Sequence, residues 1–351
     1  MALEGPPSKP DNRRVSVQFR REVVTSEILH PAQNFRPVRC EVEVRWDPLT
    51  GHASRIVKDV ELLPTSSFDL EAFARQTQAN CFFCPGRLEQ ATPRLPSAIH
   101  AGGRIQRGEA ILFPNIVTYS QYSSVSIYSP GLHFLPLERM TPQLVADNLH
   151  AQVEFVSTVM RYDNRAQWAS INANHMLPSG SSLFHPHTQG AVDRFPTTFQ
   201  RLLAEVSPER FEVYLEVERQ SGERYIGRIA GIEWLASFAP VGFHELRAFI
   251  PGTSSPAQLS GEQVEGLGQG IAIALNLYGD LGFQSFNAAL YGAPPTQSGY
   301  MLNLRMVARS NLQPLYRSDA TYYERLHWQA MVDTAPEDLA ARARQRFGTG
   351  R

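Results

Sequence analysis

The sequence predicts an α+β fold in which a duplicated unit forms an antiparallel sheet with flanking helices. Of the 351 residues, 42% are apolar, which is enough for one large domain or two of ordinary size. Strand-like and helix-like patterns follow one another in the same order in both halves of the chain. In addition, Ser-Ile-Asn-Ala at residues 170–173 matches Ser-Phe-Asn-Ala at residues 285–288.

In the first half, residues 38–62 predict a hairpin, because valines alternate with charged residues before a DPLTG turn. Residues 110–137 are rich in β-branched and aromatic side chains and predict further strands. Residues 141–164 predict a helix, with apolar residues at helical spacing, Thr141 as N-cap and a proline at the first position. The segment 168–174 predicts the strand that follows this helix.

The second half repeats this plan. Residues 234–240 and 245–252 predict strands, and residues 259–282 predict a helix that starts with a capping box of Ser260 and Gln263. Further along the chain, two more strands and one long closing helix are predicted at 284–290, 299–309 and 318–347. The expected division of the chain is a disordered tail at 1–14, a catalytic unit with the metal site at 15–200, and a second unit at 201–347.

Charge and hydropathy exclude several classes of protein. The 33 basic and 34 acidic residues nearly cancel, which argues against a broad basic face for nucleic acid. No apolar run in the sequence is long enough to span a membrane, and the first residues lack the apolar core of a signal peptide. Three cysteines do not suggest a disulfide framework. We therefore expect a cytoplasmic protein that binds neither nucleic acid nor a membrane.

Cys81 and Cys84 form a C-x-x-C pair in the sequence CFFCPG. Such a pair can be redox-active, or it can supply half of a metal site. A redox pair is expected to open a helix, whereas here Pro85 and Gly86 follow at once and favour a tight turn. The metal half-site is the better interpretation, provided that two further ligands exist.

His185 and His187 flank one proline in the sequence GSSLFHPHTQ, and Gln189 follows them. On a strand, residues at i and i+2 point to the same face, so the two imidazoles can bind one metal ion. Alternatively, one imidazole can bind a metal while the other does chemistry. The Gly-Ser-Ser run before them lets backbone N–H groups approach phosphate oxygens.

A complete set of metal ligands is obtained by adding His133, which lies in a segment bounded by prolines and a glycine. Zinc takes four donors, often mixed cysteine and histidine. The expected set is Cys81, Cys84, His133 and His185, a closed Cys2His2 arrangement that is typical of a structural zinc site.

Four motifs, taken in order, resemble the galactose-1-phosphate uridylyltransferase family of the histidine triad superfamily. They are RWDPLTG, CFFCPG, SPGLHFLPL and GSSLFHPHTQ. The likeness extends over roughly residues 45–345, since YRSDATYYERL and TAPEDLAARAR resemble the C-terminal helix of that family. It implies duplicated histidine-triad-like units, of which only the first keeps its histidines.

The resemblance implies a role for each matching residue. His187 matches the family's nucleophile, which forms a covalent nucleotidyl-histidine, and Gln189 matches the glutamine that hydrogen-bonds the phosphoryl group. The matching Zn2+ ligands are Cys81, Cys84, His133 and His185. The matching substrate-binding residues are Ser181 and Ser182 at the phosphates, Asn115 and Asn174 near the nucleotide, and Tyr323 and Glu324 at the sugar.

The function that the resemblance implies is nucleotidyl transfer between a nucleoside diphosphate sugar and a sugar 1-phosphate. It proceeds by double displacement in a homodimer, as in the hexose-1-phosphate uridylyltransferases of galactose metabolism. One alternative is a phosphorylase that uses phosphate as acceptor and acts on a nucleoside diphosphate sugar or a dinucleoside polyphosphate. Another is a non-catalytic scaffold that is stabilised by zinc and binds nucleotide without turnover. A trapped covalent adduct would exclude this second alternative.

Three positions depart from the family pattern. Thr188 stands where glycine is usual, and we expect its side chain to narrow the space beside the phosphate. Only Arg55 and Lys58 follow the hairpin turn, where the family has an arginine-rich segment. Asn303 and Arg305 replace a C-terminal His-x-His pair, so we do not expect a second metal site.

Overall fold

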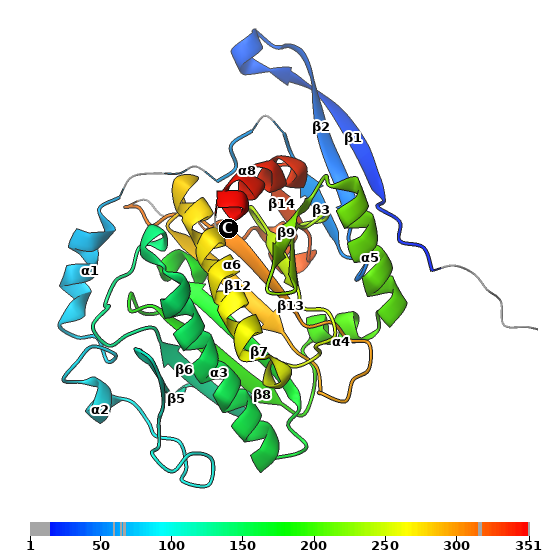
Figure 1. Cartoon of the computed structure of the whole chain (residues 1–351). Coiled ribbons are helices and arrows are strands. Elements are labelled where there is room, and N and C mark those ends of the chain that lie inside the picture. Colours follow the sequence, from blue (N-terminus) through cyan, green and yellow to red (C-terminus); the bar gives the residue numbers. More distant parts are fainter. Residues whose placement is uncertain (1–14, 59, 64, 66–67, 315–317, 350–351) are drawn as a thin grey trace, which may run out of the picture.

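The computed structural model describes residues 15–58, 60–63, 65, 68–314 and 318–349. The predicted tail at residues 1–14 lies outside these residues. In the described part of the chain the strands form one sheet of ten and one sheet of four. The larger sheet lies at the centre of the body with long helices on one face, and the smaller sheet lies at one end (Figure 1).

The elements are numbered in chain order. The strands of the large sheet are β4 (Ile105–Arg107), β5 (Ala110–Pro114), β6 (Tyr122–Ile127), β7 (Trp168–His175), β8 (His187–Asp193), β9 (Tyr225–Ile229), β10 (Ile232–Ala236), β11 (Leu246–Phe249), β12 (Ser285–Tyr291) and β13 (Asn303–Arg309). The strands of the small sheet are β1 (Arg21–His30), β2 (Arg36–Trp46), β3 (Ala53–Ile56) and β14 (Ala330–Val332). The α-helices are α1 (Leu70–Gln78), α2 (Leu88–Ala91), α3 (Pro142–Tyr162), α4 (Thr198–Ala204), α5 (Pro208–Ser221), α6 (Gly261–Asp280), α7 (Tyr322–Leu326) and α8 (Pro336–Thr349). Within the described residues, none of these helices has the length and apolar character needed to cross a lipid bilayer.

The large sheet consists of two halves with the same strand order. From one edge to the centre the strands are β4, β5, β6, β8 and β7, and from the other edge they are β9, β10, β11, β13 and β12. In each half a long helix leads from the third strand to the central one: α3 joins β6 to β7, and α6 joins β11 to β12. All pairings described in this sheet are antiparallel. The predicted α+β fold is confirmed. The predicted unit boundary at residues 200 and 201 falls within α4 and stays a prediction.

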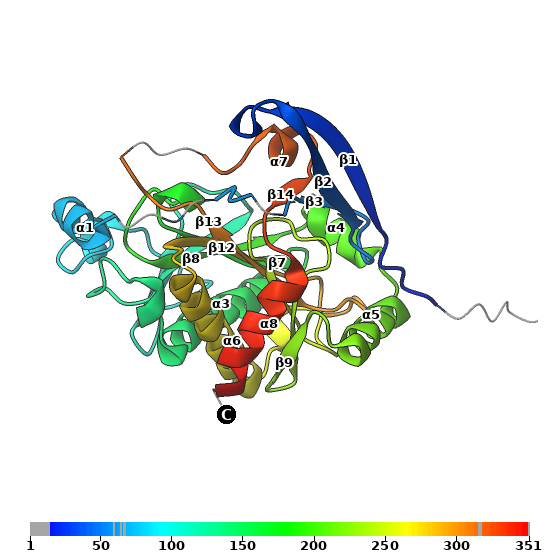
Figure 2. The same ribbon diagram turned by 90° about the horizontal axis from the view of Figure 1, so that it is seen from above.

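Helices α3 and α6 pack against each other on one face of the sheet, and α7 lies on the opposite side (Figure 2). Helix α3 begins where Thr141 Oγ1 accepts a hydrogen bond from a backbone N–H of the first turn, at 3.3 Å. Helix α6 begins with the predicted capping box of Ser260 and Gln263. A β-carbon at Gly268 of α6 would lie 2.9 Å from the side chain of Ala146 in α3, so glycine permits the close approach of the helices.

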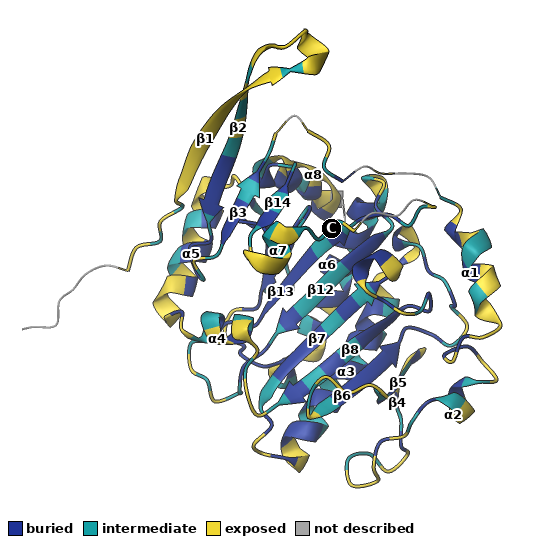
Figure 3. Cartoon of the chain, turned by 180° about the vertical axis from the view of Figure 1, so that it is seen from behind, coloured by how far each residue is buried: buried dark blue, intermediate teal, exposed yellow. Residues whose placement is uncertain are grey.

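The main core lies between these helices and the sheet. Its largest fully buried side chain is the indole of Trp234. Leu275 of α6 and Leu304 and Met306 of β13 are among the other apolar residues buried in this core. Burial of one such side chain stabilises the fold by about 1.5–3 kcal/mol. Figure 3 views the sheet from the other side, where β7, β8 and β12 lie in front of the helices and where the candidate site is found.

The small sheet has the order β1–β2–β3–β14. The predicted hairpin at residues 38–62 is confirmed by the antiparallel pairing of β2 and β3. Strand β1, which no sequence pattern predicted, pairs along β2 and makes a two-stranded ribbon that projects from the body (Figure 1).

The prediction of one continuous helix over residues 318–347 is wrong. This segment forms α7, then strand β14, then α8. Strand β14 pairs in parallel with β3, and this pairing buries Ala330 and Val332. Pro336 is the first residue of α8, a position that suits proline, whereas proline inside a helix would interrupt it.

Candidate active site

His187 is the first residue of β8, which lies between β6 and β7 in the large sheet. Side chains alternate along a strand, so His187 and Gln189 face one side of the sheet and Thr188 faces the other. Thr188 pairs with Ala173 of β7, and the next residues along each strand, His187 and Asn174, therefore lie beside each other on the same face.

A pocket of about 470 Å³ opens beside His187. Its polar lining residues are Thr92, Asn115, Ser182, His187 and Gln189. The remaining walls are mostly apolar and include Phe82, Phe83, Phe113, Ile116, Val117 and Tyr119. Among the described residues that line the pocket there is no lysine or arginine. A mostly apolar pocket of this volume with a few convergent polar groups is typical of a small-molecule site.

The protonation of His187 is set by its own strand. Its Nδ1 lies 2.8 Å from the backbone carbonyl oxygen of His185, which can only accept a hydrogen bond. The proton is therefore on Nδ1, and Nε2 keeps its lone pair. His187 is 9% exposed, and burial lowers its pKa below 6.5, while the hydrogen bond to the carbonyl acts in the opposite direction. The ring is neutral near pH 7 and its Nε2 is a nucleophile.

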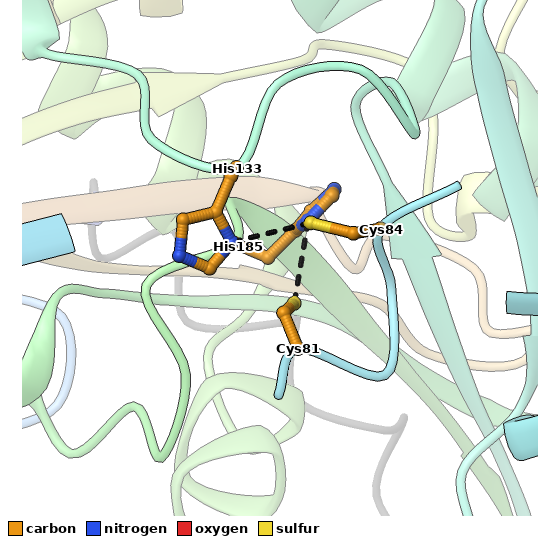
Figure 4. A group of neighbouring side chains, drawn as sticks. All are labelled: Cys81, Cys84, His133 and His185. Carbon is orange, nitrogen blue, oxygen red and sulfur yellow. Dashed lines mark hydrogen bonds between the residues drawn. The ribbon is translucent and has the colours of Figure 1, made fainter. Parts of the chain in front are cut away.

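The four predicted metal ligands form one buried group whose ligand atoms all lie within 4.8 Å of one another (Figure 4). Nδ1 of His133 lies 3.4 Å from Sγ of Cys84. Nδ1 of His185 lies 3.6 Å from Sγ of Cys81 and 3.7 Å from Sγ of Cys84. In a tetrahedral site with Zn–S of about 2.3 Å and Zn–N of about 2.0 Å, neighbouring sulfur and nitrogen atoms are about 3.5 Å apart. The spacing of the donors fits a tetrahedral metal ion.

Protonation of the group also fits a metal. Nε2 of His133 donates to the carbonyl oxygen of Ala74 at 3.1 Å, and Nε2 of His185 donates to that of Ser129 at 2.9 Å. Each Nδ1 is thus left as a lone-pair donor that faces the sulfur atoms. Burial lowers the pKa of His185 to about 4, so this ring is neutral. Burial and the neighbouring thiol raise the pKa of Cys84 to about 12, and a bound cation would reverse this and favour the thiolate.

Phe83 lies between the metal group and His187 and was missing from the predicted site residues. Its ring centroid lies 5.8 Å from that of His185 and 5.5 Å from that of His187, edge-on to both. The same side chain lines the pocket. Its position between the two cysteines of the C-x-x-C motif is the sequence signal that could have identified it.

Comparison with known proteins places the chain in a family and a fold. No family model matches the sequence. An uncharacterized protein of Archaeoglobus fulgidus is 33% identical over 337 residues, which cover 94% of this chain and 98% of the archaeal protein. The chain belongs to the family of this archaeal protein.

Several solved structures have a similar fold. Two are from Arabidopsis thaliana. A GalT-like protein has a TM-score of 0.63 and 18% identity, with 86% of this chain and 98% of that chain covered. An ADP-glucose phosphorylase with bound ADP-glucose has a TM-score of 0.64 and 17% identity, with 87% and 99% covered. A uridylyltransferase has a TM-score of 0.58 and 21% identity, with 87% and 98% covered. The chain therefore has the galactose-1-phosphate uridylyltransferase fold, as the resemblance predicted.

Two of the predicted substrate-binding residues, Asn115 and Ser182, line the pocket. Oδ1 of Asn115 accepts a hydrogen bond from the N–H of Val117 at 3.2 Å and so shapes the loop that forms the apolar wall. Ser181 Oγ donates to the carbonyl oxygen of Leu183 at 2.7 Å, which makes this hydroxyl part of the loop that precedes His187. The substrate contacts of these residues stay predictions.

Tyr323 and Glu324 lie outside this pocket within the described chain, in α7. The Glu324 carboxylate caps its own helix and accepts hydrogen bonds from the backbone N–H and Oγ1 of Thr321, at 2.8 and 2.5 Å. The guanidinium of Arg55 lies over the Tyr323 ring, 5.2 Å from its centroid. Their predicted contact with a sugar stays a prediction.

Thr188 does not narrow the space beside the phosphate, contrary to the expectation from the sequence. Its side chain points toward α3, where Oγ1 donates to Oδ1 of Asn148 at 2.5 Å and accepts from Nε2 of Gln152 at 3.0 Å. Oε1 of Gln152 accepts in turn from Oγ of Ser124 at 2.9 Å. The physical reason is the alternation along β8, which directs residue 188 to the face opposite His187.

The strand register makes Arg305 the counterpart of His187 in the second half of the sheet. Ala173 and Ala288 occupy the same place in the sequence repeat, and each is paired with a residue of the next strand. Ala173 pairs with Thr188, and the residue before Thr188 is His187. Ala288 pairs with Met306, and the residue before Met306 is Arg305. An arginine thus takes the place of His187 in the second half.

Arg305 belongs to a buried cluster of ion pairs. Its Nη1 donates to Glu245 at 2.9 Å, and its Nη2 lies 3.5 Å from Oδ2 of Asp47. Asp47, from the DPLTG turn, also pairs with Arg247 at 3.1 Å. Paired charges thus occupy the place in the second half that corresponds to His187 in the first. They also connect the small sheet to the second half of the large one.

Proposed function

We propose that the protein is a nucleotidyltransferase that acts on nucleoside diphosphate sugars through a covalent bond to Nε2 of His187. One observation carries the proposal: Nδ1 of His187 is engaged by the carbonyl of His185, which leaves a nucleophilic Nε2 on a ring that lines the pocket. The fold likeness to a uridylyltransferase and to an ADP-glucose phosphorylase supports the same class of chemistry.

In the first half-reaction, the lone pair of His187 Nε2 attacks the α-phosphorus of the donor. A P–N bond forms, the bond from the α-phosphorus to the bridging oxygen breaks, and the sugar 1-phosphate leaves with that oxygen and the electron pair. The hydrogen bond from Nδ1 to the carbonyl of His185 stabilises the positive charge that the ring gains. In the second half-reaction, an oxygen of the acceptor phosphate attacks the α-phosphorus, the P–N bond breaks, and the neutral ring is restored.

Neutral donors stabilise the phosphoryl group in this proposal. Gln189 lines the pocket on the same face of β8 as His187, so its amide N–H groups are available to the phosphoryl oxygens. Ser182 supplies a hydroxyl and a backbone N–H at the same end of the pocket. Removal of one such preorganised donor typically lowers the rate by about 10²–10³-fold.

Cys81, Cys84, His133 and His185 would hold a zinc ion, which supplies a fixed link between the C-x-x-C loop and the segment before β8. His185 provides the carbonyl that sets the tautomer of His187. When the His185 ring is held, this carbonyl is held too, which keeps the nucleophile in position for in-line attack.

The proposed donor and acceptor are a UDP-hexose and a hexose 1-phosphate, as the resemblance implies. A second candidate reaction is phosphorolysis, in which orthophosphate takes the nucleotidyl group from His187. The fold likeness to an ADP-glucose phosphorylase structure, with a TM-score of 0.64, supports this alternative. The apolar walls of the pocket, for example Phe82 and Ile116, would pack against either base.

We also propose that the protein is a homodimer that works in the cytoplasm. Large apolar side chains are exposed on the β1–β2 ribbon and on the segment around α7. They include Leu29 (60% exposed), Phe35 (66%), Leu326 (78%) and Trp328 (70%). Exposed apolar patches of this kind are typical of subunit interfaces. Light scattering of the purified protein should give twice the 39.3 kDa mass of the chain, and a mass of one chain would contradict the proposal.

The central experiment is a search for the covalent adduct. The protein is incubated with UDP-glucose or ADP-glucose labelled at the α-phosphorus, denatured, and tested for acid-labile label on the chain. We expect label on the wild type and on His150→Ala, a control at a half-buried histidine of α3 that pairs with Glu265, and none on His187→Ala. Release of the label by a different hexose 1-phosphate, galactose 1-phosphate, indicates a transferase, and release by orthophosphate indicates a phosphorylase; glucose 1-phosphate only reverses the first half-reaction in either case. Binding without any label would leave only the non-catalytic scaffold.

A further inference from the structure

Four polar side chains form a row across the open face of the sheet, at the edge where His187 begins β8. Asn174 lies next to His187, and Asn287 of β12 is paired in register with Asn174 of β7. Asn287 is also paired with Val307 of β13, so Arg309, two residues further on, lies on the same face. The row thus runs from the nucleophile into the second half of the chain.

Hydrogen bonds connect this row from an ion pair to Asn174. The Asp319 carboxylate accepts from Nε of Arg309 at 2.7 Å and from its Nη2 at 2.5 Å. Nη1 of Arg309 donates to Oδ1 of Asn287. Nδ2 of Asn287 then donates to Oδ1 of Asn174 at 2.7 Å and to the carbonyl oxygen of Ser179 at 3.0 Å.

The chemistry of arginine gives this chain of bonds a direction. A guanidinium has donors and no acceptor, so Asn287 must present its oxygen to Arg309 and its NH2 group to Asn174. Asn174 must then present its oxygen to Asn287, and its own Nδ2 is turned away from Asn287. That nitrogen lies beside Gly180, 3.8 Å from the point where a β-carbon would stand, at the start of the Gly-Ser-Ser run that leads to the pocket.

We propose that Asn287 is a positioning residue: together with Arg309 it holds the Asn174 amide with its NH2 group toward a phosphoryl group bound beside His187. The inference rests on the proposed function in one respect, since it requires a phosphoryl ligand at that place. Asn287 itself touches no substrate. It determines whether Asn174 offers the phosphate a donor or an acceptor, and it fixes the backbone of the preceding loop through Ser179.

The substitution Asn287→Asp tests the direction of the chain without a change of shape. A carboxylate beside Arg309 stays ionised and can only accept hydrogen bonds. It would therefore draw the NH2 group of Asn174 toward itself and turn the Asn174 oxygen toward the phosphate. Loss of a donor to a charged group, with an acceptor in its place, should weaken phosphoryl binding about 10- to 100-fold.

The measurement is calorimetric titration of the full-length chain with UMP, AMP, uridine and adenosine. We expect Asn287→Asp to weaken the nucleotides and to leave the nucleosides unchanged. Asn174→Ala should also weaken nucleotide binding, and adding Asn287→Asp to Asn174→Ala should cause no further loss, because Asn287 acts on the phosphate only through the Asn174 amide. Nucleotide affinity equal to wild type in Asn287→Asp, or equal losses for nucleotides and nucleosides, would overturn the inference. Equal affinity of the wild type for a nucleotide and its nucleoside, for example UMP and uridine, would also overturn the inference.

A matched control separates positioning from stability. Asn276→Asp on α6 also replaces a hydrogen-bonded amide, whose Nδ2 donates to the carbonyl of Ala272 at 2.7 Å. Asn276→Asp should have a lower thermal midpoint of unfolding than the wild type but the same affinity for UMP. If it also loses affinity for UMP, the effect of Asn287→Asp reflects stability and not positioning. If Asn287→Asp behaves as expected but no nucleoside diphosphate sugar labels His187, the inference stands and the proposed nucleotidyl transfer is refuted. If label forms at the same rate and nucleotide affinity is unchanged in Asn287→Asp, transfer stands and the inference falls.

Discussion

Replacement of Thr188 by valine should destabilise the protein without any effect on the pocket. Valine has nearly the shape of threonine, so the change removes the hydroxyl and little else. In the wild type, that hydroxyl donates to Oδ1 of Asn148 and accepts from Nε2 of Gln152. The side chains of Asn148 and Gln152 are 1% and 0% exposed, so water cannot take the place of the lost partner.

The magnitude follows from the two atoms that lose their partner. A buried polar group without a hydrogen bond costs about 1–3 kcal/mol, so two such groups cost about 2–6 kcal/mol in Thr188→Val. Thr188→Ser keeps the hydroxyl and loses one methyl group, which costs about 1 kcal/mol. The difference between valine and serine at this position should therefore be about 1–5 kcal/mol, a large part of a typical total stability of about 5–15 kcal/mol.

Urea unfolding followed by circular dichroism measures this difference, with Thr188→Ser as the matched control. If the free energy of unfolding of Thr188→Val is within about 0.5 kcal/mol of that of Thr188→Ser, the network does not carry the energy assigned to it. Thr188→Gly provides a second check. Because residue 188 faces α3, the glycine variant should accept the same phosphate acceptors as the wild type, and a wider range would show that the side chain reaches the pocket after all.

Three further predictions concern the metal, the nucleophile and the ion pairs. Wild-type protein should contain about one zinc ion per chain by elemental analysis, and Cys81→Ser should contain less, since one of four donors is weakened; metal-free wild type would contradict the ligand set. Because burial lowers the pKa of His187 below 6.5, the rate of adduct formation in rapid-quench experiments should stay level from about pH 8 down to 6.5 and fall only in more acid solution; a fall centred above 6.5 would refute this. Burial alone would raise the pKa of Glu337, but hydrogen bonds and charge from Arg45, and then from Arg224, lower it from 4.5 to about 2. Its contribution to stability is therefore present above pH 4.5 and is lost as the pH falls toward 2, so the urea midpoint of Glu337→Gln should decline less steeply with acid than that of the wild type.

Much of the local structure and of the donor chemistry could be predicted from the sequence. The caps of α3 and α6 depend on side chains within one turn, which is why Thr141 and Ser260 identified the helix starts. The metal group could be predicted because few residue types bind zinc and because the C-x-x-C turn places two of them together. The strand expected to hold both histidines does not reach His185, because β8 begins at His187. Alternation along β8 places His187 and Gln189 on one face, and the same rule, applied to Thr188, would have predicted that it points away from them.

The remaining features depend on contacts that no local pattern encodes. Strand β14 is a strand because β3 offers it a pairing edge, although its sequence lies within a helix-like segment. Asn287 meets Asn174 across 113 residues of sequence, through the register of β12 on β7. The sequence alone determined which chemical groups the chain carries and which short elements they begin, because donor type, periodicity and caps act within a few residues. Tertiary structure decided which groups face one another, because register and burial are set by packing between distant segments.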